Sequence, residues 1–489
     1  MTTTKGQVRG VEDGPVIKFL GIPYAAPPVG ALRFRAPEPR AAWSGVLNAD
    51  KPGPLCPQNA GAPGAQAQDR TEDCLYLNVW RPAGTVHDLP VLVYIPGGAF
   101  VLSGGSGING SALAADQHVI VVTFNYRLGI LGFLASPALD NGSADSGDYG
   151  IQDVGAVLRW VKDNIAAFGG NPDNVTLGGE SAGALMTCMS AVSPDTRGLF
   201  QKMIVQSGPC AFNWPKLQAQ YRPEEEVLAA LHCDVGSPQQ VAACLRSPKL
   251  TAADFLNAQK SLGRRIMWGP SVGGSVLPEQ PATAIGSLPT LMGFVKYELI
   301  PGFYSFQGKL GDGTPNPANE TEYLSALETQ FGAHASAVAQ EYPLDRYRTG
   351  NLALNTITAD KPGVLGICTD VKTFGIAQRS GKAPLYAYEF DDPNAPPVLG
   401  GQGGPVHVSN QQYVFPHRPL PAASQSLSER MIAYWGNFIR DGNPNGEGLA
   451  RWPRYEAPAD VLQLVPYAIR PGIDVNAAHH CMFWDRLDG

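Results

Sequence analysis

The sequence is short of charge and lacks any long apolar run. Only 16% of its 489 residues are Asp, Glu, Lys or Arg, against roughly 25% in typical soluble domains. The net charge of −7 disfavours nucleic acids and anionic membranes as partners, because both attract a basic protein surface. No apolar stretch reaches the ~18 residues of a transmembrane helix. The composition therefore points away from nucleic-acid-binding and membrane-spanning proteins.

The eight cysteines form no CxxC pair and no Cys/His cluster with zinc-ligand spacing. This excludes the common zinc sites and leaves disulfides or buried thiols. The first ten residues, MTTTKGQVRG, lack the apolar segment of a signal peptide. We therefore expect either that the protein is not exported or that a signal sequence has been removed.

Short β-rich runs alternate with helical patterns along the chain, which predicts an α/β fold with a mostly parallel sheet. The predicted strands lie at 90–98, 118–127, 174–180, 202–208, 289–294 and 384–390, and the predicted helices at 151–167 and 428–440. The stretches 211–288 and 301–366 are predicted to be helical and irregular insertions that roof the sheet. Because no linker separates independent units, residues 1–489 are predicted to form one domain.

The segment Gly179–Gly183 matches the pattern G-x-S-x-G, with Ser181 at its centre. It stands between a β-rich run and the start of a helix, the context in which the pattern marks a nucleophile. The helix behind such a serine offers unpaired N–H groups and the positive end of a dipole. Ser181 is therefore the predicted nucleophile.

A second glycine-rich segment, Pro96-Gly97-Gly98-Ala99-Phe100, follows the run VLVYI. Small residues allow backbone N–H groups to point into a cavity instead of into a sheet. We predict that the N–H groups of Gly98, Ala99 and Ala182 form an oxyanion hole for a tetrahedral intermediate.

A serine nucleophile needs a histidine base and an acid that orients it, and α/β hydrolases carry them in the order Ser, Asp/Glu, His. Glu298 follows one predicted strand, and His407 lies in a glycine-rich loop after the next. They are the first candidates. Asp391 and Asp392 remain alternative acids, since they directly follow PLYAYEF, and His417 remains an alternative base.

Nearly the whole sequence resembles the type-B carboxylesterase and cholinesterase family. The similar segments are FLGIPYAAPPVGALRFRAPEP at 19–39, EDCLYLNV at 72–79, NYRLG at 125–129, GGESAGA at 178–184, WGNFIRDGNPN at 435–445 and WPRY at 452–455. The resemblance implies the α/β-hydrolase fold, with Ser181 as nucleophile, Glu298 as acid and His407 as base. It implies a serine carboxylesterase that works through an acyl-enzyme, with no metal or cofactor.

The resemblance also implies structural bonds. The implied disulfides are Cys56–Cys74, Cys233–Cys244 and Cys368–Cys481, which leave Cys188 and Cys210 as expected free thiols. The implied ion pairs are Arg33–Glu72 and Arg127–Asp153. Disulfides persist in oxidising compartments, so we expect an extracellular or periplasmic protein, with the cytoplasm as the alternative.

Five positions depart from the family pattern. Pro96 replaces a His or Tyr before the glycines, and Leu299 replaces the glycine after the acid. Val408 and Asn410 replace the Gly and Glu that usually follow the histidine by one and three residues, and Gly273 replaces an Asp. Because none is a catalytic group, these departures affect the expected substrate rather than the expected chemistry.

The lack of an aromatic residue in the first disulfide loop excludes choline esters from the expected substrates. Cholinesterases bind quaternary ammonium on an aromatic ring in the first disulfide loop, but residues 57–73 contain no aromatic residue. A general carboxylic ester is therefore expected, and an amide or carbamate hydrolase with the same triad is the alternative. A more remote alternative is a non-catalytic binding or adhesion protein with the same fold. The candidate pocket walls are Phe100, Trp268, Phe303, Tyr304 and Phe306.

Overall fold

The computed structural model describes residues 1–59, 70–140, 144–221, 224–263, 267–298, 319–347, 350–398 and 403–487. An eleven-stranded sheet crosses the molecule in the order β14-β13-β12-β11-β10-β9-β7-β8-β6-β4-β3. Its strands are β3 (Val11–Asp13), β4 (Val16–Pro23), β6 (Tyr76–Pro82), β7 (Leu89–Ile95), β8 (Ile120–Phe124), β9 (Gly170–Glu180), β10 (Lys202–Gln206), β11 (Thr290–Val295), β12 (Leu385–Phe390), β13 (Val461–Leu464) and β14 (Arg470–Ile473). A small sheet joins β1 (Thr2–Thr3), β2 (Gly6–Arg9) and β5 (Val46–Asn48).

The centre of the large sheet is parallel, from β8 through β7, β9, β10, β11 and β12 to β13. Antiparallel pairs occur at its two ends, among β3, β4, β6 and β8 and between β13 and β14. The predicted α/β-hydrolase fold, with its mostly parallel sheet, is confirmed.

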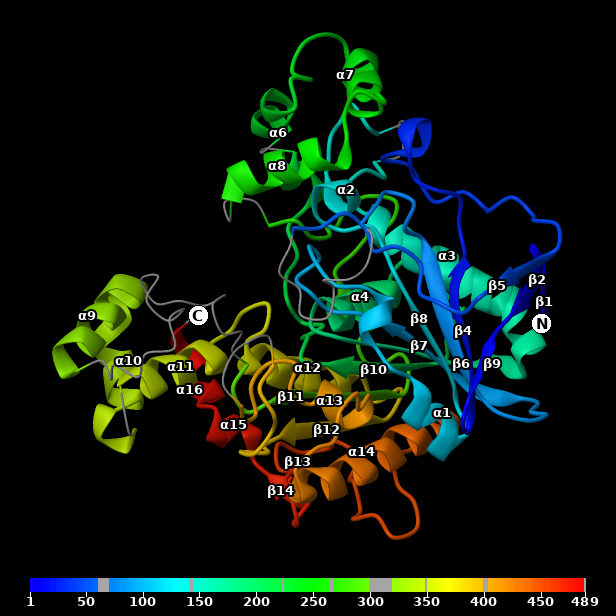
Figure 1. Cartoon of the computed structure of the whole chain (residues 1–489). Helices are drawn as coiled ribbons and strands as arrows, with labels where there is room; N and C mark the ends of the chain where they lie inside the picture. The colour runs from blue at the N-terminus through cyan, green and yellow to red at the C-terminus, as the bar shows by residue number, and fades with distance from the viewer. Residues whose placement is uncertain are drawn as a thin grey trace.

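Helices cover both faces of this sheet (Figure 1). Along β7, Val91, Val93 and Ile95 enter one apolar core, and the alternating Leu92 and Tyr94 enter the other. Side chains alternate in this way because the strand period is two residues. The first core contains buried residues of α3 (Tyr149–Asn164), α4 (Ala182–Ser190) and α12 (Ile367–Ser380). The second contains those of α1 (Ser111–Gln117), α13 (Gln411–Val414) and α14 (Ala422–Asp441).

Where they are described, the two stretches predicted as insertions contain both helices and irregular segments. The helices of 211–288 are α5 (Leu217–Gln220), α6 (Glu224–Ala230), α7 (Pro238–Leu245) and α8 (Ala252–Leu262), and those of 301–366 are α9 (Glu320–Phe331), α10 (Ala335–Glu341) and α11 (Gly350–Asp360). Figure 1 shows α6, α7 and α8 grouped at the top of the molecule, near α2 (Gly129–Phe133), and α9 to α11 grouped at the left. In the described residues, no helix has the length and apolar character that crossing a membrane requires.

Four disulfides cross-link the chain. Cys56–Cys74, Cys233–Cys244 and Cys368–Cys481 are present as the resemblance implied. The expectation that Cys188 and Cys210 are free is wrong, because they form a fourth disulfide. Cys188 lies on α4, and Cys210 lies four residues after β10, so the bridge joins two segments that adjoin in space. Spacing alone could not reveal this pair, because the two residues meet only after β9 and β10 have paired.

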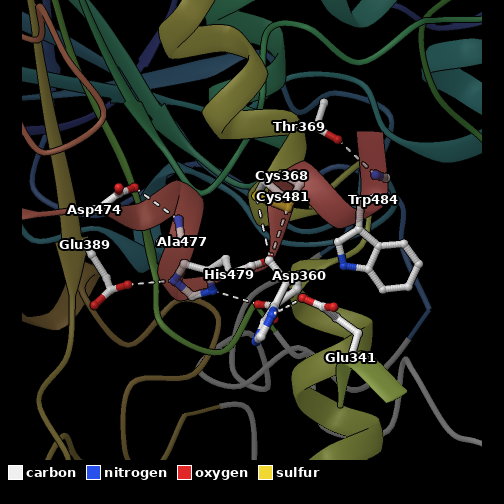
Figure 2. Close-up of a disulfide and its surroundings, with 12 residues drawn as sticks. Glu341, Asp360, Cys368, Thr369, Glu389, Asp474, Ala477, His479, Cys481 and Trp484 are labelled. Atoms are coloured by element: carbon white, nitrogen blue, oxygen red, sulfur yellow. Dashed lines mark hydrogen bonds and ion pairs between the residues drawn. A yellow bond between two sulfur atoms is a disulfide. The ribbon is translucent and has the colours of Figure 1, made fainter. Parts of the chain in front are cut away.

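The C-terminal segment is fixed by a buried histidine between two acids. His479 Nδ1 lies 2.6 Å from Asp360 and its Nε2 lies 2.7 Å from Glu389. Figure 2 shows this histidine between α11 and β12, beside the Cys368–Cys481 disulfide that attaches α16 (Cys481–Leu487) to α12. Burial lowers the pKa of His479, but the two carboxylates outweigh it and raise the pKa to about 10. The imidazole is therefore cationic at neutral pH.

Replacing His479 by glutamine is expected to lower the free energy of unfolding by about 3–5 kcal/mol, because two buried carboxylates lose their cation. His480→Gln is the matched control, since its more exposed pair with Glu341 is worth less than about 1 kcal/mol. Urea titration of both variants measures the difference.

The stability due to this charge should depend on pH. A pKa raised in the folded state means that the contribution is complete below the usual value of about 6.5. It is then lost as the pH rises through about 10. The difference between the His479 and His480 variants should therefore narrow between pH 7 and 10. A constant difference would contradict a charged His479.

Candidate active site

Ser181 stands on a sharp turn between β9 and α4. Its φ of 56° is unusual for a residue with a side chain, and such strain is held by the surrounding structure. The Ser181 N–H donates to the carbonyl of Gln206 on β10. A Cβ on Gly183 would lie 2.1 Å from the carbonyl oxygen of Ile95. Glycine is therefore needed there, because the helix begins directly against the end of β7.

The glycine-rich loop after β7 lies against the serine. A Cβ on Gly97 would come within 3.2 Å of the Ser181 Cβ. Gly98 has a φ of 112°, and a Cβ there would meet the carbonyl oxygen of Leu102 at 2.1 Å. Ala99 follows with a φ of 51°. The sequence therefore brings the backbone of the predicted oxyanion loop to the nucleophile, at the carboxyl ends of β7 and β9.

Three side chains from separate segments meet at this edge. His407 Nε2 lies 2.8 Å from Ser181 Oγ, and His407 Nδ1 lies 2.5 Å from Glu298 Oε2. The other oxygen of Glu298 accepts a hydrogen bond from the N–H of Val295 at 2.9 Å. All three side chains are buried. The arrangement can pass the serine proton to the imidazole and stabilise the cation that results.

A second carboxyl group, Glu180, also faces the histidine. Its Oε1 lies 3.2 Å from His407 Nε2. Burial raises the pKa of Glu180 to about 7, and the charge of Glu298 adds to this while His407 opposes it. Burial lowers the pKa of His407, but Glu180 and Glu298 outweigh it, so the net pKa of His407 is raised. The sequence analysis named Glu180 only as part of the serine motif and did not predict its contact with His407. Its position directly before Ser181 could have signalled that contact.

The alternative acids and base lie elsewhere. Asp391 accepts a hydrogen bond from Lys296 at 2.7 Å. Asp392 accepts hydrogen bonds from the hydroxyls of Tyr413 and Ser424. His417 is exposed. The structure thus groups Glu298 and His407 with Ser181 and gives these three alternatives other surroundings.

The residue after the histidine is strained. Val408 has a φ of 77°, a region that β-branched residues rarely enter. Such a conformation costs about 1–3 kcal/mol and persists only where the neighbourhood imposes it. The usual glycine would adopt this φ freely. The departure at this position, visible in the sequence, therefore has a conformational consequence beside the catalytic group.

Only part of the predicted pocket is described. Phe100 packs edge-on against Phe133 and Trp214, with ring centroids 5.4 and 5.8 Å apart. Trp268 lies in an apolar core shared with α2, α6, α7 and α8. Phe303, Tyr304, Phe306 and the departure Leu299 lie outside the described residues. Trp214 was missed, because seven irregular residues separate it from β10 and no pattern signals its contact with Phe100.

Both implied ion pairs are present; Arg127–Asp153 is fully buried, and Arg33–Glu72 is partly buried. Arg33 contacts Glu72 through two nitrogens at 2.6 and 2.7 Å. Arg127 contacts Asp153 in the same forked manner at 2.8 and 2.7 Å. Paired guanidinium–carboxylate contacts fix orientation as well as distance. The second pair anchors the segment after β8 to α3.

Known proteins and one family model match nearly the whole length of this chain. A family model described as "Carboxylesterase family" matches residues 1–484. "Para-nitrobenzyl esterase" of Bacillus subtilis (strain 168) is 35% identical over 93% of this chain and 92% of its own. "Carboxylesterase 1C" of Rattus norvegicus is 33% identical over 94% of this chain and 89% of its own. A solved structure titled "PNB ESTERASE" has a TM-score of 0.79 and 32% identity, covering 98% of this chain and 99% of its own.

Proposed function

Because the chain belongs to the carboxylesterase family and is a carboxylic-ester hydrolase, we propose that Ser181, His407 and Glu298 carry out this hydrolysis. The observation that carries the proposal is the pair of contacts on His407. Its Nε2 lies within hydrogen-bond distance of Ser181 Oγ, and its Nδ1 within that of Glu298. A base held between a nucleophile and an orienting acid is the arrangement that serine acyl transfer requires.

In the first half-reaction, His407 Nε2 takes the proton of Ser181 while Oγ attacks the ester carbonyl. The developing oxyanion accepts hydrogen bonds from the N–H groups of Gly98, Ala99 and Ala182. His407 then gives its proton to the departing alcohol, which leaves an acyl-enzyme. The buried Glu298 carboxylate favours the imidazolium that exists during this transfer.

In the second half-reaction, His407 takes a proton from a water molecule. The resulting hydroxide attacks the acyl group on Ser181, and the same N–H groups bind the second oxyanion. His407 returns the proton to Ser181 Oγ, and the carboxylic acid is released. Proton transfers therefore use one imidazole nitrogen, Nε2, throughout both halves.

The substrate is proposed to be an uncharged carboxylic ester, not a choline ester. The first disulfide loop, residues 57–73, has no aromatic residue to receive a quaternary ammonium. Phe100 directly follows the oxyanion loop and packs with Phe133 and Trp214 in a buried apolar cluster of rings. Two relatives bear the names para-nitrobenzyl esterase and carboxylesterase 1C, which supports a carboxylic ester as the substrate.

The compartment is proposed to be oxidising, either extracellular or periplasmic. Four disulfides link the described residues. Thiol systems keep cysteines reduced in most cytosols, so a chain with this many disulfides is best suited to an extracellular or periplasmic location.

A fluorophosphonate probe tests the proposed nucleophile. It should label the protein at one site per chain and abolish hydrolysis of para-nitrophenyl acetate in the same proportion. Peptide mass spectrometry should place the label on Ser181. Labelling elsewhere, or full activity after complete labelling of Ser181, would contradict the proposed function.

A further inference from the structure

The loop that carries His407 is held by two amide side chains. Asn410 Nδ2 donates to the hydroxyl oxygen of Tyr388 at 3.0 Å, and Gln411 Nε2 donates to that of Tyr94 at 3.4 Å. Tyr94 in turn donates to Gln206 Oε1 at 3.1 Å. We call these five residues, Tyr94, Gln206, Tyr388, Asn410 and Gln411, the tyrosine–amide layer. It ties the histidine loop to β7, β10 and β12.

The layer lies directly beneath the catalytic edge of the sheet. Gln206 pairs in register with Glu180, the residue before Ser181. The Gln206 carbonyl also accepts the N–H of Ser181. One residue therefore holds the nucleophile through its backbone and the layer through its side chain. Tyr94, Gln206, Tyr388 and Asn410 are all fully buried, where hydrogen bonds are strengthened by the low local dielectric.

The layer is also uncharged. Burial raises the pKa of Tyr94 and of Tyr388 well above the usual value of about 10. Both phenols therefore stay neutral over any practical assay range, and the amides do not titrate. Such a layer can fix the position of His407 without competing with Glu298 for its proton.

The strained residue Val408 lies between His407 and Asn410, and its strain works against the hydrogen bonds of the tyrosine–amide layer. A β-branched residue at a φ of 77° favours a different backbone conformation. The two amide side chains, Asn410 and Gln411, follow Val408 by two and three residues. We propose that Tyr388 and Tyr94 are positioning residues for the base: they hold Asn410 and Gln411, and thereby keep His407 in reach of Ser181 and Glu298 against the strain at Val408. This inference rests on the proposed role of His407.

Tyr388→Phe tests the proposal, with Tyr386→Phe as the matched control. Tyr386 is the next tyrosine on the same face of β12 and is outside the layer. We expect the Tyr388 variant to lose kcat about tenfold, the effect of roughly one buried hydrogen bond on an activation barrier. The KM should stay close to the wild-type value, and thermal unfolding should resemble that of the control.

The pH dependence of kcat/KM separates a positioning role from a merely structural one, because a residue that only stabilises the fold should not change it. Glu180 and Glu298 raise the pKa of His407, so a loosened loop should lower it. The acidic limb of kcat/KM in Tyr388→Phe should therefore shift to lower pH, while the control keeps the wild-type limb. Equal kcat and equal limbs in the two variants would overturn the proposal.

Two further variants keep the test decisive. Val408→Gly removes the strain, so it should partly restore kcat in the Tyr388→Phe background, and no recovery would overturn the role assigned to strain. If Tyr388→Phe fails to fold, Gln411→Met at a half-buried position replaces it, with a smaller loss of kcat and the same shift of the limb expected. An unchanged kcat and limb there would overturn the proposal.

Failure of this inference can be distinguished from failure of the proposed function. If wild type and Tyr386→Phe hydrolyse para-nitrophenyl acetate and take the phosphonate label on Ser181, the proposed function stands whatever Tyr388→Phe does. If neither is labelled at Ser181, the proposed function fails, and this inference fails with it.

Discussion

Replacing Ser181 by alanine is expected to lower kcat by about 10⁴- to 10⁶-fold, because no acyl-enzyme can form without the hydroxyl. The residual rate should come from the oxyanion loop and from substrate binding alone. KM should change little, since the serine hydroxyl contributes little to ground-state binding. Steady-state hydrolysis of para-nitrophenyl acetate, with active sites counted by phosphonate titration of the wild type, measures the loss.

The fold should survive this substitution. Ser181 has a strained backbone, but alanine also has a Cβ and experiences the same strain, so thermal unfolding should be near that of the wild type. Ser207→Ala is a suitable control, since Ser207 likewise has a positive φ of 55° directly after β10. Turnover of Ser181→Ala close to the wild-type rate would exclude Ser181 as the nucleophile.

The sequence predicted the centre of the sheet because that part follows local rules. Apolar β-rich runs such as 90–98 and 384–390 became β7 and β12, whose side chains are buried on both faces. Such strands read as continuous apolar runs, which turns and glycines delimit. The helix predicted at 428–440 is the C-terminal two-thirds of α14, which begins earlier, at Ala422.

The edges of the sheet were less accessible to sequence reasoning. Strands β3, β4 and β6 pair antiparallel at one end, and β6 begins inside the segment 72–79, which the sequence marked only as a family motif. Helix α14 begins after Pro421 without a side-chain cap, so the usual start signal was missing. Edge positions depend on pairing between distant segments, which local patterns do not encode.

The candidate site shows the same division. Ser181 and the oxyanion glycines lie in short contiguous motifs, so spacing alone was informative. Glu298 and His407 lie 109 residues apart, and layout left Asp391, Asp392 and His417 open until the family resemblance was considered. The Cys188–Cys210 disulfide and the tyrosine–amide layer could not be predicted, because each joins segments brought together only by the order of the strands.

Replacing Glu298 by glutamine is expected to lower kcat by about 10³- to 10⁴-fold. The carboxylate accepts from two donors at once, the N–H of Val295 on one oxygen and His407 Nδ1 on the other. A glutamine amide has one accepting oxygen and one NH₂ group. Its NH₂ group would therefore have to point at one of the two hydrogen-bond donors, which it cannot accept from. Either the loop loses its bond to Val295 or His407 is held in the wrong tautomer.

The alternative acids provide the controls for this prediction. Asp391→Asn removes charge from a half-buried pair with Lys296, and kcat should change by less than about threefold, since surface-type pairs are worth under ~1 kcal/mol. Asp392→Asn should lower thermal stability instead, because the buried carboxylate accepts from Tyr413 and Ser424. The reverse pattern, with activity lost in an Asp391 or Asp392 variant and kept in Glu298→Gln, would move the acid to the end of β12. Since β12 also leads into the histidine loop, that result would require His407 to turn its Nδ1 away from β11, which the contact with Glu298 opposes.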